Sequence, residues 1–496
     1  MTTAEPLATG WWLVTIGILV AAGALSSRLS GRFGLPFYLV FLGIGMLAGV
    51  NGPGGILFDD FGSSFRLGTL ALVLILFDGG LNTSLDAVRR VIRPAGLLAT
   101  VGVVLVAALT ALAARAFGLP WSQAALVGAI VSSTDAAAVF AQLRGARLRL
   151  RDRVATTIEV ESGLNDPMAV LLTIGITRWL AGEESSPVAL AGGVVLQFAI
   201  GGVVGWAVGR GAARVLRRFR SATSGLYPVL TISTALIAFG AATVLQGSGL
   251  LAVYLAGLLL GSERLPYRSG LLRFHDATAW LSQVGMFLLL GLLVTPADAL
   301  PAVGWGVGVA LALTVVARPL VTLLCLAPFG YRLRESLFIG WAGLRGAVPI
   351  VLAIFPVLAG IDGAREVFHG VFFIVLIGAV LPGAALGWAA RRARLEEAPA
   401  PVPRAVLEMV STDEIDGEVV SFHISPALAV AGAAIRDVPF PEGAAVLLVV
   451  RGSRLIPARG STLLEPGDHV FLFARAADRP LIELLFGAPG SEDPAV

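Results

Sequence analysis

The sequence predicts an all-α membrane protein that crosses the bilayer about thirteen times and ends in a small α+β cytoplasmic domain. Composition, a succession of apolar segments and the placement of arginine lead to this prediction. Of the 496 residues, 56% are hydrophobic and only 14% are charged, and the mean hydropathy is +0.85. Soluble domains carry about 25% charged residues, so a water-soluble enzyme is excluded. The net charge of +3 is too small to indicate nucleic-acid binding.

Residues 1–390 contain thirteen apolar segments separated by short loops. Several approach the roughly 20 residues that a helix needs to cross about 30 Å of hydrocarbon. In chain order, the segments are expected at 11–28, 34–50, 64–81, 94–117, 121–142, 154–178, 187–210, 225–246, 248–262, 275–294, 300–325, 335–358 and 367–388.

The distribution of arginine supports this count and orients the chain. The loops after odd-numbered segments, here called the arginine-rich loops, hold 23 arginines. The loops after even-numbered segments hold only Arg66, Arg115, Arg178 and Arg365. Loops rich in arginine stay in the cytoplasm. We therefore expect a multi-pass protein of the cytoplasmic (inner) membrane, with its N-terminus outside and its C-terminus in the cytoplasm.

The pattern changes after the last apolar segment. Short β-like runs appear, V-V-S-F-H-I-S, A-A-V-L-L-V-V and H-V-F-L-F-A, and a helix-like stretch follows at about 476–486. The predicted organisation is a membrane domain at 1–392, a linker at 393–402, a cytoplasmic domain at 403–486 and a flexible tail at 487–496.

A group of seven ionisable residues lies within the apolar segments, away from the arginine-rich loops. A charge at the centre of a bilayer costs about 2.5–3.5 kcal/mol even on the lenient insertion scale, so such residues are functional candidates. Five acids against two bases leave surplus carboxylate, as a site for a cation or a proton requires. The residues are Asp78, Asp135, Glu159, Glu161, Asp166, Arg318 and Arg345.

Two of the segments are interrupted in a way that points to a transporter. The fifth contains S-S-T-D at 132–135, and the twelfth reads G-L-R-G-A-V-P at 343–349. Being seven apart, they run in opposite directions through the membrane. Interrupted helices in two oppositely oriented halves indicate inverted repeats with a binding site near the midplane. The sixth segment places Ser162, Asn165 and Asp166 on one helix face.

The T-D of the fifth segment and the N-D of the sixth resemble the signature of the monovalent cation:proton antiporters. The similarity covers about 10–390 and favours the NhaP-like, potassium/proton branch, because Ala rather than Pro follows T-D. It implies an NhaA-like fold of thirteen helices with inverted repeats and crossed discontinuous helices. It also implies a homodimer.

The resemblance also implies roles for individual residues. Thr134, Asp135, Ser162 and Asp166 would bind the monovalent cation, and Asp78 could join them. Asn165 would position or stabilise the pair formed by Asp135 and Asp166. Among the buried charges, the implied structural ion pair joins Glu161 to Arg345, with Arg318 as a rival partner.

Competition for one carboxylate supplies the expected mechanism. Because burial disfavours the charged form of an aspartate, Asp166 is expected to hold either a proton or a cation. Exchange of K⁺, or alternatively Na⁺, for H⁺ would then proceed by alternating access. By family analogy, Asn rather than Asp at 165 favours electroneutral exchange. The sequence shows no ATP-binding motif, so we expect a secondary transporter without a cofactor.

Residues 403–486 resemble the C-terminal lobe of RCK (TrkA-C) regulatory domains. This resemblance implies regulation of transport, with a small anionic ligand such as a cyclic dinucleotide as a candidate effector. Two other classes of protein fit the sequence less well. A cation channel gated by an RCK-type domain lacks a T-V-G-Y-G-like filter here. An intramembrane aspartyl protease using Asp135 and Asp166 lacks the G-x-G-D context.

Overall fold

The computed structural model describes residues 4–487 apart from 34–35, 51, 147, 184–186, 219–223, 264, 266, 398–416 and 476. The chain divides into two compact units, each considered by itself below. The membrane unit comprises 1–218, 225–263 and 272–396. The second comprises 397–496 with two short segments, 219–224 and 264–271.

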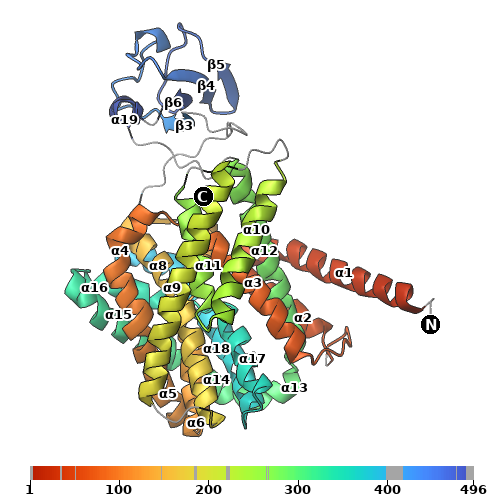
Figure 1. The fold of residues 1–496 in the computed structure, drawn as a ribbon. Coiled ribbons are helices and arrows are strands. Elements are labelled where there is room, and N and C mark those ends of the chain that lie inside the picture. Colours follow the sequence, from red (N-terminus) through yellow and green to blue (C-terminus); the bar gives the residue numbers. More distant parts are fainter. Residues whose placement is uncertain are drawn as a thin grey trace. The chain divides into compact units, whose positions relative to one another are not determined.

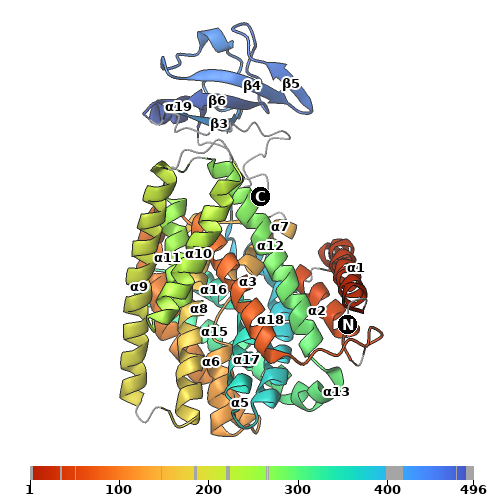
Figure 2. The ribbon, with the colours of Figure 1, turned by 45° about the vertical axis from the view of Figure 1, so that its right-hand side comes forward.

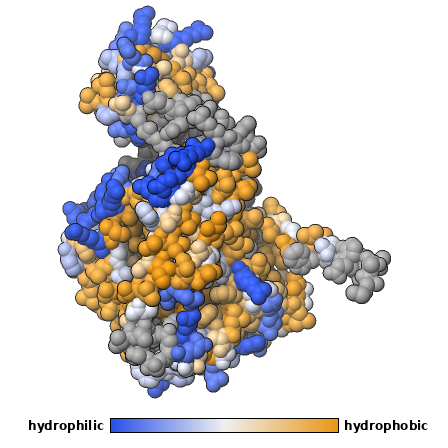
Figure 3. Space-filling view, in the orientation of Figure 1, coloured by the Kyte–Doolittle hydropathy of each residue, from blue (hydrophilic) through white to orange (hydrophobic). Residues whose placement is uncertain are grey.

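Long apolar helices build the membrane unit (Figure 1). Within the described residues, seven helical runs are long and apolar enough to cross a membrane. Apolar side chains cover the middle of the face seen in Figure 3. The seven runs lie in α3 (Phe61–Asn82), α4 to α5 (Leu85–Ala116), α9 (Pro187–Arg218), α10 (Leu226–Val244), α12 (Arg268–Leu293), α13 to η4 (Pro296–Phe329) and α18 (Ala364–Ala393).

The remaining helices are shorter or more polar. The helix α8 (Asp152–Leu180) is 29 residues long, but its buried acids Glu161 and Asp166 lower its hydropathy. The N-terminal helix is α1 (Ala4–Phe33). The short helices are α2 (Phe37–Ala48), α6 (Trp121–Ile130), α7 (Ala136–Gly145), α11 (Gly249–Gly261), α16 (Leu333–Trp341) and α17 (Val348–Leu358).

Each of the thirteen predicted segments coincides with a helix or a pair of helices, so the predicted fold class is confirmed. The largest difference is at the fourth segment, where the helix begins at Leu85 rather than at about 94. Ser84 caps this helix by accepting a hydrogen bond from the amide of Ala87 at 3.2 Å. The first turns were missed because they are amphipathic, with Arg89 and Arg90 exposed.

The two halves of the unit repeat their irregularities seven segments apart. The fourth segment contains a π-helical turn, η1 (Leu98–Gly102), and the eleventh contains another, η3 (Leu313–Ala317). The fifth segment unwinds between α6 and α7, and the twelfth unwinds between α16 and α17. Matching defects in oppositely directed segments are typical of an inverted repeat.

Glycines allow α11 to pack closely on α3; Figure 2 shows α9, α10 and α11 alongside one another. A Cβ atom at Gly257 would lie 2.6 Å from the carbonyl oxygen of Phe77. One at Gly80 would lie 2.5 Å from the carbonyl oxygen of Tyr254. Small residues at such contacts let helix backbones approach within the membrane, and here they fix the position of Tyr254.

The polypeptide remains ordered beyond the end of the last membrane helix. Helix α18 extends to Ala393, and β2 (Glu396–Glu397) pairs with β1 (Arg149–Leu150). The amide of Arg151 also donates to the carbonyl of Leu395 at 3.0 Å. The first residues of the predicted linker at 393–402 are therefore helix and strand, and 398–402 lie outside the described residues.

The C-terminal unit contains a four-stranded antiparallel sheet in the order β3-β6-β4-β5, with one helix. Alternate residues of β3 and β6, such as Phe422 and Leu472, form its core with Phe486. The three predicted strands and the helix are present. The short β5 was not predicted; it forms a hairpin with β4 around Gly452, whose φ is +60°. The elements are β3 (Glu418–His423), β4 (Ala445–Arg451), β5 (Arg454–Pro457), β6 (His469–Ala474) and α19 (Arg479–Phe486).

A bidentate ion pair holds the β4 end to the turn before β6. Arg451 Nε and Nη2 donate to the two carboxylate oxygens of Asp468 at 2.8 and 2.9 Å. The amide of Glu465 donates to the same carboxylate at 2.9 Å. Asp468 is fully buried, so these donors are needed to stabilise its negative charge. The same carboxylate, with that of Glu465, raises the pKa of Arg451.

We predict that Asp468→Asn destabilises the C-terminal unit by about 2 kcal/mol, because a buried carboxylate loses its charge-assisted bonds. Hydrogen exchange of the full-length protein, read by mass spectrometry, should show about thirtyfold faster exchange in β6. Asp437→Asn is the matched control, since Asp437 forms only an exposed pair with Arg436 at 3.7 Å. Unchanged protection in Asp468→Asn would contradict the structural role of this pair.

Candidate functional site

The first interruption is a non-helical stretch at 131–135 between α6 and α7, a turn that leads into extended backbone at Asp135. Hydroxyl and carboxylate side chains compete with helical hydrogen bonds and close the two helix ends. The Ser132 hydroxyl donates to the carbonyl of Ala129 at 2.6 Å. Asp135 caps α7 by accepting from the amide of Ala138 at 3.0 Å. The S-S-T-D sequence therefore ends one helix and starts the next.

The second interruption, 342–347 between α16 and α17, depends on glycine and proline. A Cβ atom at Gly346 would lie 2.0 Å from Oδ2 of Asp135, so only glycine admits that carboxylate. A Cβ atom at Gly343 would lie 2.6 Å from Nε of Arg318. Pro349 stands in the first turn of α17, where proline is well tolerated.

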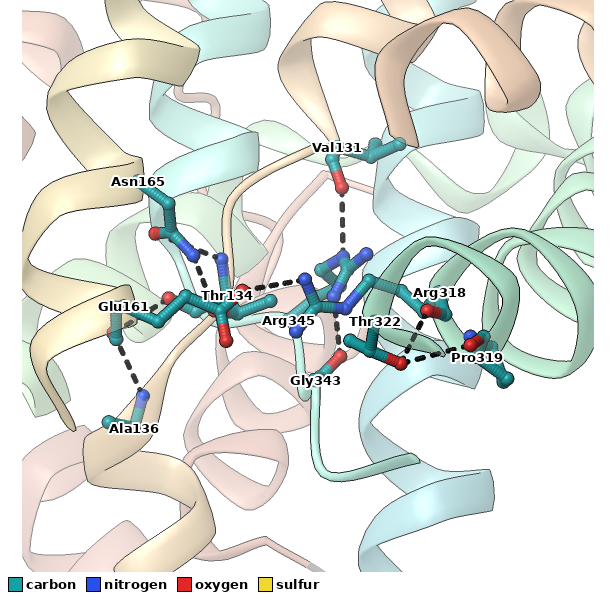
Figure 4. Close-up of polar contacts among 11 residues, drawn as sticks. Val131, Thr134, Ala136, Glu161, Asn165, Arg318, Pro319, Thr322, Gly343 and Arg345 are labelled. Atoms are coloured by element: carbon teal, nitrogen blue, oxygen red, sulfur yellow. Dashed lines mark hydrogen bonds and ion pairs between the residues drawn. The ribbon is translucent and has the colours of Figure 1, made fainter. Parts of the chain in front are cut away.

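The two interruptions meet and hydrogen-bond to each other (Figure 4). The amide of Asp135 donates to the carbonyl of Leu344 at 2.9 Å. Arg345 Nε donates to the carbonyl of Val131 at 2.8 Å, and its Nη1 donates to the carbonyl of Gly343. The C-terminal ends of α6 and α16 carry partial negative charge, which a nearby positive side chain stabilises. Arg345 places its guanidinium group at both of these ends. The place where these two interruptions meet is called the crossing below. It corresponds to the crossed discontinuous helices that the family resemblance implied.

Helix α8 supplies partners for the unwound backbone at Thr134. The Ser162 hydroxyl donates to the carbonyl of Thr134 at 2.9 Å and accepts from the amide of Ala136 at 3.1 Å. Asn165 Nδ2 donates to the Thr134 hydroxyl at 2.6 Å, and its Oδ1 accepts from the Thr134 amide at 3.4 Å. The predicted polar face of α8 thus contacts the interruption directly.

The bonds of Asn165 differ from those expected. The resemblance implied that Asn165 positions or stabilises the two aspartates. In the structure, its side-chain NH2 group donates to the Thr134 hydroxyl and its side-chain oxygen accepts from the Thr134 amide. The side chain is fully buried, so it has to satisfy its own donors and acceptors. Its effect on Asp135 is therefore indirect, through the neighbouring residue.

Asp166 lies beside this network with an unsatisfied oxygen. The residue is 5% exposed, and its Oδ1 has no hydrogen-bond partner within the described part of the chain. The buried Ser133 hydroxyl lies beside this carboxylate, and no hydrogen bond of normal geometry joins it to another described residue. Asp166 and Asp135 are close enough for their negative charges to repel each other. Two carboxylates and a neighbouring hydroxyl are therefore available to a cation or a proton.

The buried ion pair of the structure joins Glu161 to a different arginine from the one expected. Arg318 Nη1 donates to Oε1 of Glu161 at 2.7 Å, and both side chains are only 2% exposed. The pairing of Glu161 with Arg345 was therefore wrong, and the rival, Arg318, is the partner. Arg345 is occupied by carbonyls of the crossing. The π-helical turn η3 ends directly before Arg318, and such turns change the direction of following side chains.

Asp78 and Glu159 lie in other hydrogen-bonded groups. Asp78 accepts from Nδ2 of Asn82 at 3.0 Å, and the charge that acts on it most is that of Asp276. No hydrogen bond described for the chain joins Asp78 to the crossing. Glu159 accepts from the hydroxyl of Thr83. Thr83 directly follows α3 and belongs to no sequence motif, so the sequence gives no signal for its contact with Glu159.

Family comparisons match both units. The model described as "Sodium/hydrogen exchanger, transmembrane" matches residues 16–392, and the TrkA-C domain model matches 419–487. The K(+)/H(+) antiporter NhaP2 of Shewanella sp. (strain ANA-3) is 41% identical over 96% of this chain and 84% of its own length. The K(+)/H(+) antiporter NhaP of Alkalimonas amylolytica is 40% identical over 97% and 84%.

A solved structure shares the fold of the membrane unit. The sodium proton antiporter MjNhaP1 from Methanocaldococcus jannaschii superimposes with a TM-score of 0.64 at 22% sequence identity. The match covers 77% of this chain and 100% of that chain. At this identity the similarity establishes the architecture of the helices and no more.

We predict that Glu161→Gln lowers the free energy of unfolding by about 3–5 kcal/mol, because it leaves the buried charge of Arg318 unpaired. Thermal unfolding of the detergent-solubilised protein would measure the loss. Adding Arg318→Gln should recover most of the stability, whereas adding Arg345→Gln should not. Recovery by the Arg345 change instead would show that Glu161 depends on Arg345.

Proposed function

The chain belongs to the sodium/hydrogen exchanger family, and on this premise we propose that it exchanges K⁺ for H⁺ across the membrane. The observation that carries the proposal is the buried Asp166 carboxylate with an unpartnered oxygen beside the crossing. Relatives near 40% identity, named K(+)/H(+) antiporters, support K⁺ as the cation. A relative named a Na(+)/H(+) antiporter, NhaS2 of Synechocystis, is 29% identical over 70% of the chain and keeps Na⁺ as the alternative.

The proposed cation site consists of oxygen atoms around the first interruption. Oδ1 of Asp166 has no hydrogen-bond partner in the part of the chain that the structure describes, and the Ser133 hydroxyl and Asp135 lie close by. Carboxylate, hydroxyl and carbonyl oxygens are hard ligands that suit an alkali-metal cation. Thr134 and Ser162 would contribute the lone pairs that their hydrogen bonds leave free, and Asn165 would hold Thr134 in place. Asp78 would lie outside this group of oxygen ligands and act on the cation only through its charge.

The balance of buried charge supports exchange of one cation for one proton. Asp135, Glu161 and Asp166 carry three negative charges when ionised, against the positive charges of Arg318 and Arg345. The cluster is therefore one positive charge short of neutrality. Either one K⁺ or one H⁺ neutralises it, and the two exclude each other at Asp166. An uncompensated charge is costly to carry through a low-dielectric barrier, so the empty site would not cross.

Orientation, assembly and regulation complete the proposal. The arginine-rich loops support a cytoplasmic C-terminus in the cytoplasmic membrane, with the N-terminus outside. The protein would work as a homodimer, as the family resemblance implies. The TrkA-C-like unit would regulate transport by binding a small anionic nucleotide. Transport would be driven by ion gradients, as in a secondary transporter rather than an enzyme.

We predict that Asp166→Asn abolishes exchange, because an amide can neither take up and release a proton near neutral pH nor supply the negative charge that balances a bound cation. Everted vesicles with an acidic interior and a pH-sensitive dye would report alkalinisation on addition of K⁺ or Na⁺. Asp60→Asn is the matched control: Asp60 is an exposed cap of α3 that accepts from the Ser63 amide at 2.9 Å, and asparagine caps equally well. Normal K⁺-dependent alkalinisation in Asp166→Asn would disprove the assignment.

Electroneutral exchange makes a separate prediction. A transporter that moves one net charge gains or loses about 2.3 kcal/mol at about 100 mV, roughly fiftyfold in equilibrium. In proteoliposomes with a potential imposed by a thiocyanate gradient, the end point of K⁺/H⁺ exchange should not shift. An end point that follows the imposed potential would mean that more than one proton moves with each cation.

A further inference from the structure

A second carboxylate lies on the same face of α8 as Asp166. Glu159, Gly163 and Asp166 are spaced i, i+4 and i+7, which places them in one line along the helix. Glu159 is two turns, about 10 Å, closer to the beginning of α8. That helix begins at Asp152, directly after an arginine-rich loop. Glu159 therefore lies between Asp166 and the arginine-rich end of the unit.

Two hydroxyl groups from other helices converge on Glu159. Thr83, at the end of α3, donates to the Glu159 carboxylate and is 2% exposed. Tyr254, on α11, lies close to both residues and is 3% exposed. No hydrogen bond of normal geometry joins its hydroxyl to another described residue, and the Thr83 hydroxyl lies beside it. A buried hydroxyl without a partner is costly, so a ligand in this position would satisfy it.

The ring of Tyr254 separates this group from the crossing. A Cβ atom at Gly163 would lie 2.5 Å from Cε2 of the ring, so the ring packs directly on the helix there. Gly163 stands between Glu159 and Asp166 along the face. Tyr254 therefore covers the stretch of α8 that an ion would pass when moving from one carboxylate to the other.

The three helices reach the same arginine-rich end. Helix α3 finishes at Asn82, shortly before the first turns of α4 with their exposed Arg89 and Arg90, and α11 finishes at Gly261, before an arginine-rich loop. The amide of Leu85 donates to the hydroxyl of Ser262 at 3.2 Å, which ties the two ends together. Glu159 itself is partly exposed, unlike Thr83 and Tyr254. Glu159 is therefore less buried than Asp166, which lies two turns deeper along α8.

We propose that Glu159, Thr83 and Tyr254 form an outer station that holds the transported monovalent cation between the arginine-rich surface and Asp166. The inference rests on the proposed function and adds a binding step to it. The station joins a carboxylate and two hydroxyl oxygens, a ligand set suited to K⁺ or Na⁺. A purely structural bond from Thr83 to Glu159 would need neither a partly exposed carboxylate nor the unsatisfied hydroxyl of Tyr254.

The test measures the KM for K⁺ separately on each face of the membrane. Everted vesicles expose the arginine-rich face to added K⁺, and right-side-out vesicles expose the opposite face. Glu159→Gln should raise the KM about tenfold on the arginine-rich face and leave the KM on the opposite face unchanged. The maximal rate should stay within about twofold. Tyr254→Phe, which keeps the ring, should raise the same KM by about threefold.

Glu263→Gln is the matched control. Glu263 lies at the same end of the unit, where it pairs with Arg210 and Arg217, and is not part of the station. Its removal should leave both KM values unchanged. Thermal unfolding of each variant would identify a loss of folding, and Tyr254→Phe tests the station should Glu159→Gln not fold.

The outcomes separate the two proposals. Unchanged KM values in folded Glu159→Gln, or equal rises on both faces, would overturn the station while leaving the exchange function intact. Wild-type vesicles that alkalinise with neither K⁺ nor Na⁺ would overturn the exchange function, and the station with it. A rise confined to the arginine-rich face, in both Glu159→Gln and Tyr254→Phe, supports the station.

Discussion

Hydrogen bonding of the unwound backbone at the crossing is the constraint on which the rest of the membrane unit depends. Within a bilayer, amide and carbonyl groups freed from a helix have to find partners in the protein. Ser162 and Asn165 on α8 hydrogen-bond to the backbone groups of Thr134 and Ala136. A carbonyl of the second interruption accepts the hydrogen bond from the amide of Asp135. The position of α8 therefore follows from the chemistry of the interruption.

This constraint also decides how the buried charges are distributed. Arg345 is needed at the carbonyls where α6 and α16 end, so Glu161 takes its counter-charge from Arg318. Once these bonds are made, Oδ1 of Asp166 is left without a partner. The fold thus leaves one buried carboxylate to be neutralised from outside. The structural requirement and the proposed cation site therefore involve the same set of contacts.

Much of the fold could be predicted because its signals are local. Apolar length and the alternation of arginine located thirteen segments, and alternating apolar residues located β3, β4 and β6. Interruption by Ser, Thr and Asp, or by Gly and Pro, located the two unwound stretches. The start of α4 was missed because its first turns are amphipathic. Thr83 was missed because its bond to Glu159 spans 76 residues of sequence.

The sequence by itself determined which segments enter the membrane, which helices are interrupted and that carboxylates outnumber bases inside the bilayer. Hydropathy and backbone preference depend on neighbouring residues, so they can be read without a fold. Only the tertiary structure decided that Arg318 rather than Arg345 pairs with Glu161, and that Asn165 binds Thr134. Those choices depend on which side chains first satisfy the unwound backbone, and on the direction that η3 gives to Arg318. Such competition between groups far apart in sequence is settled only when the helices pack.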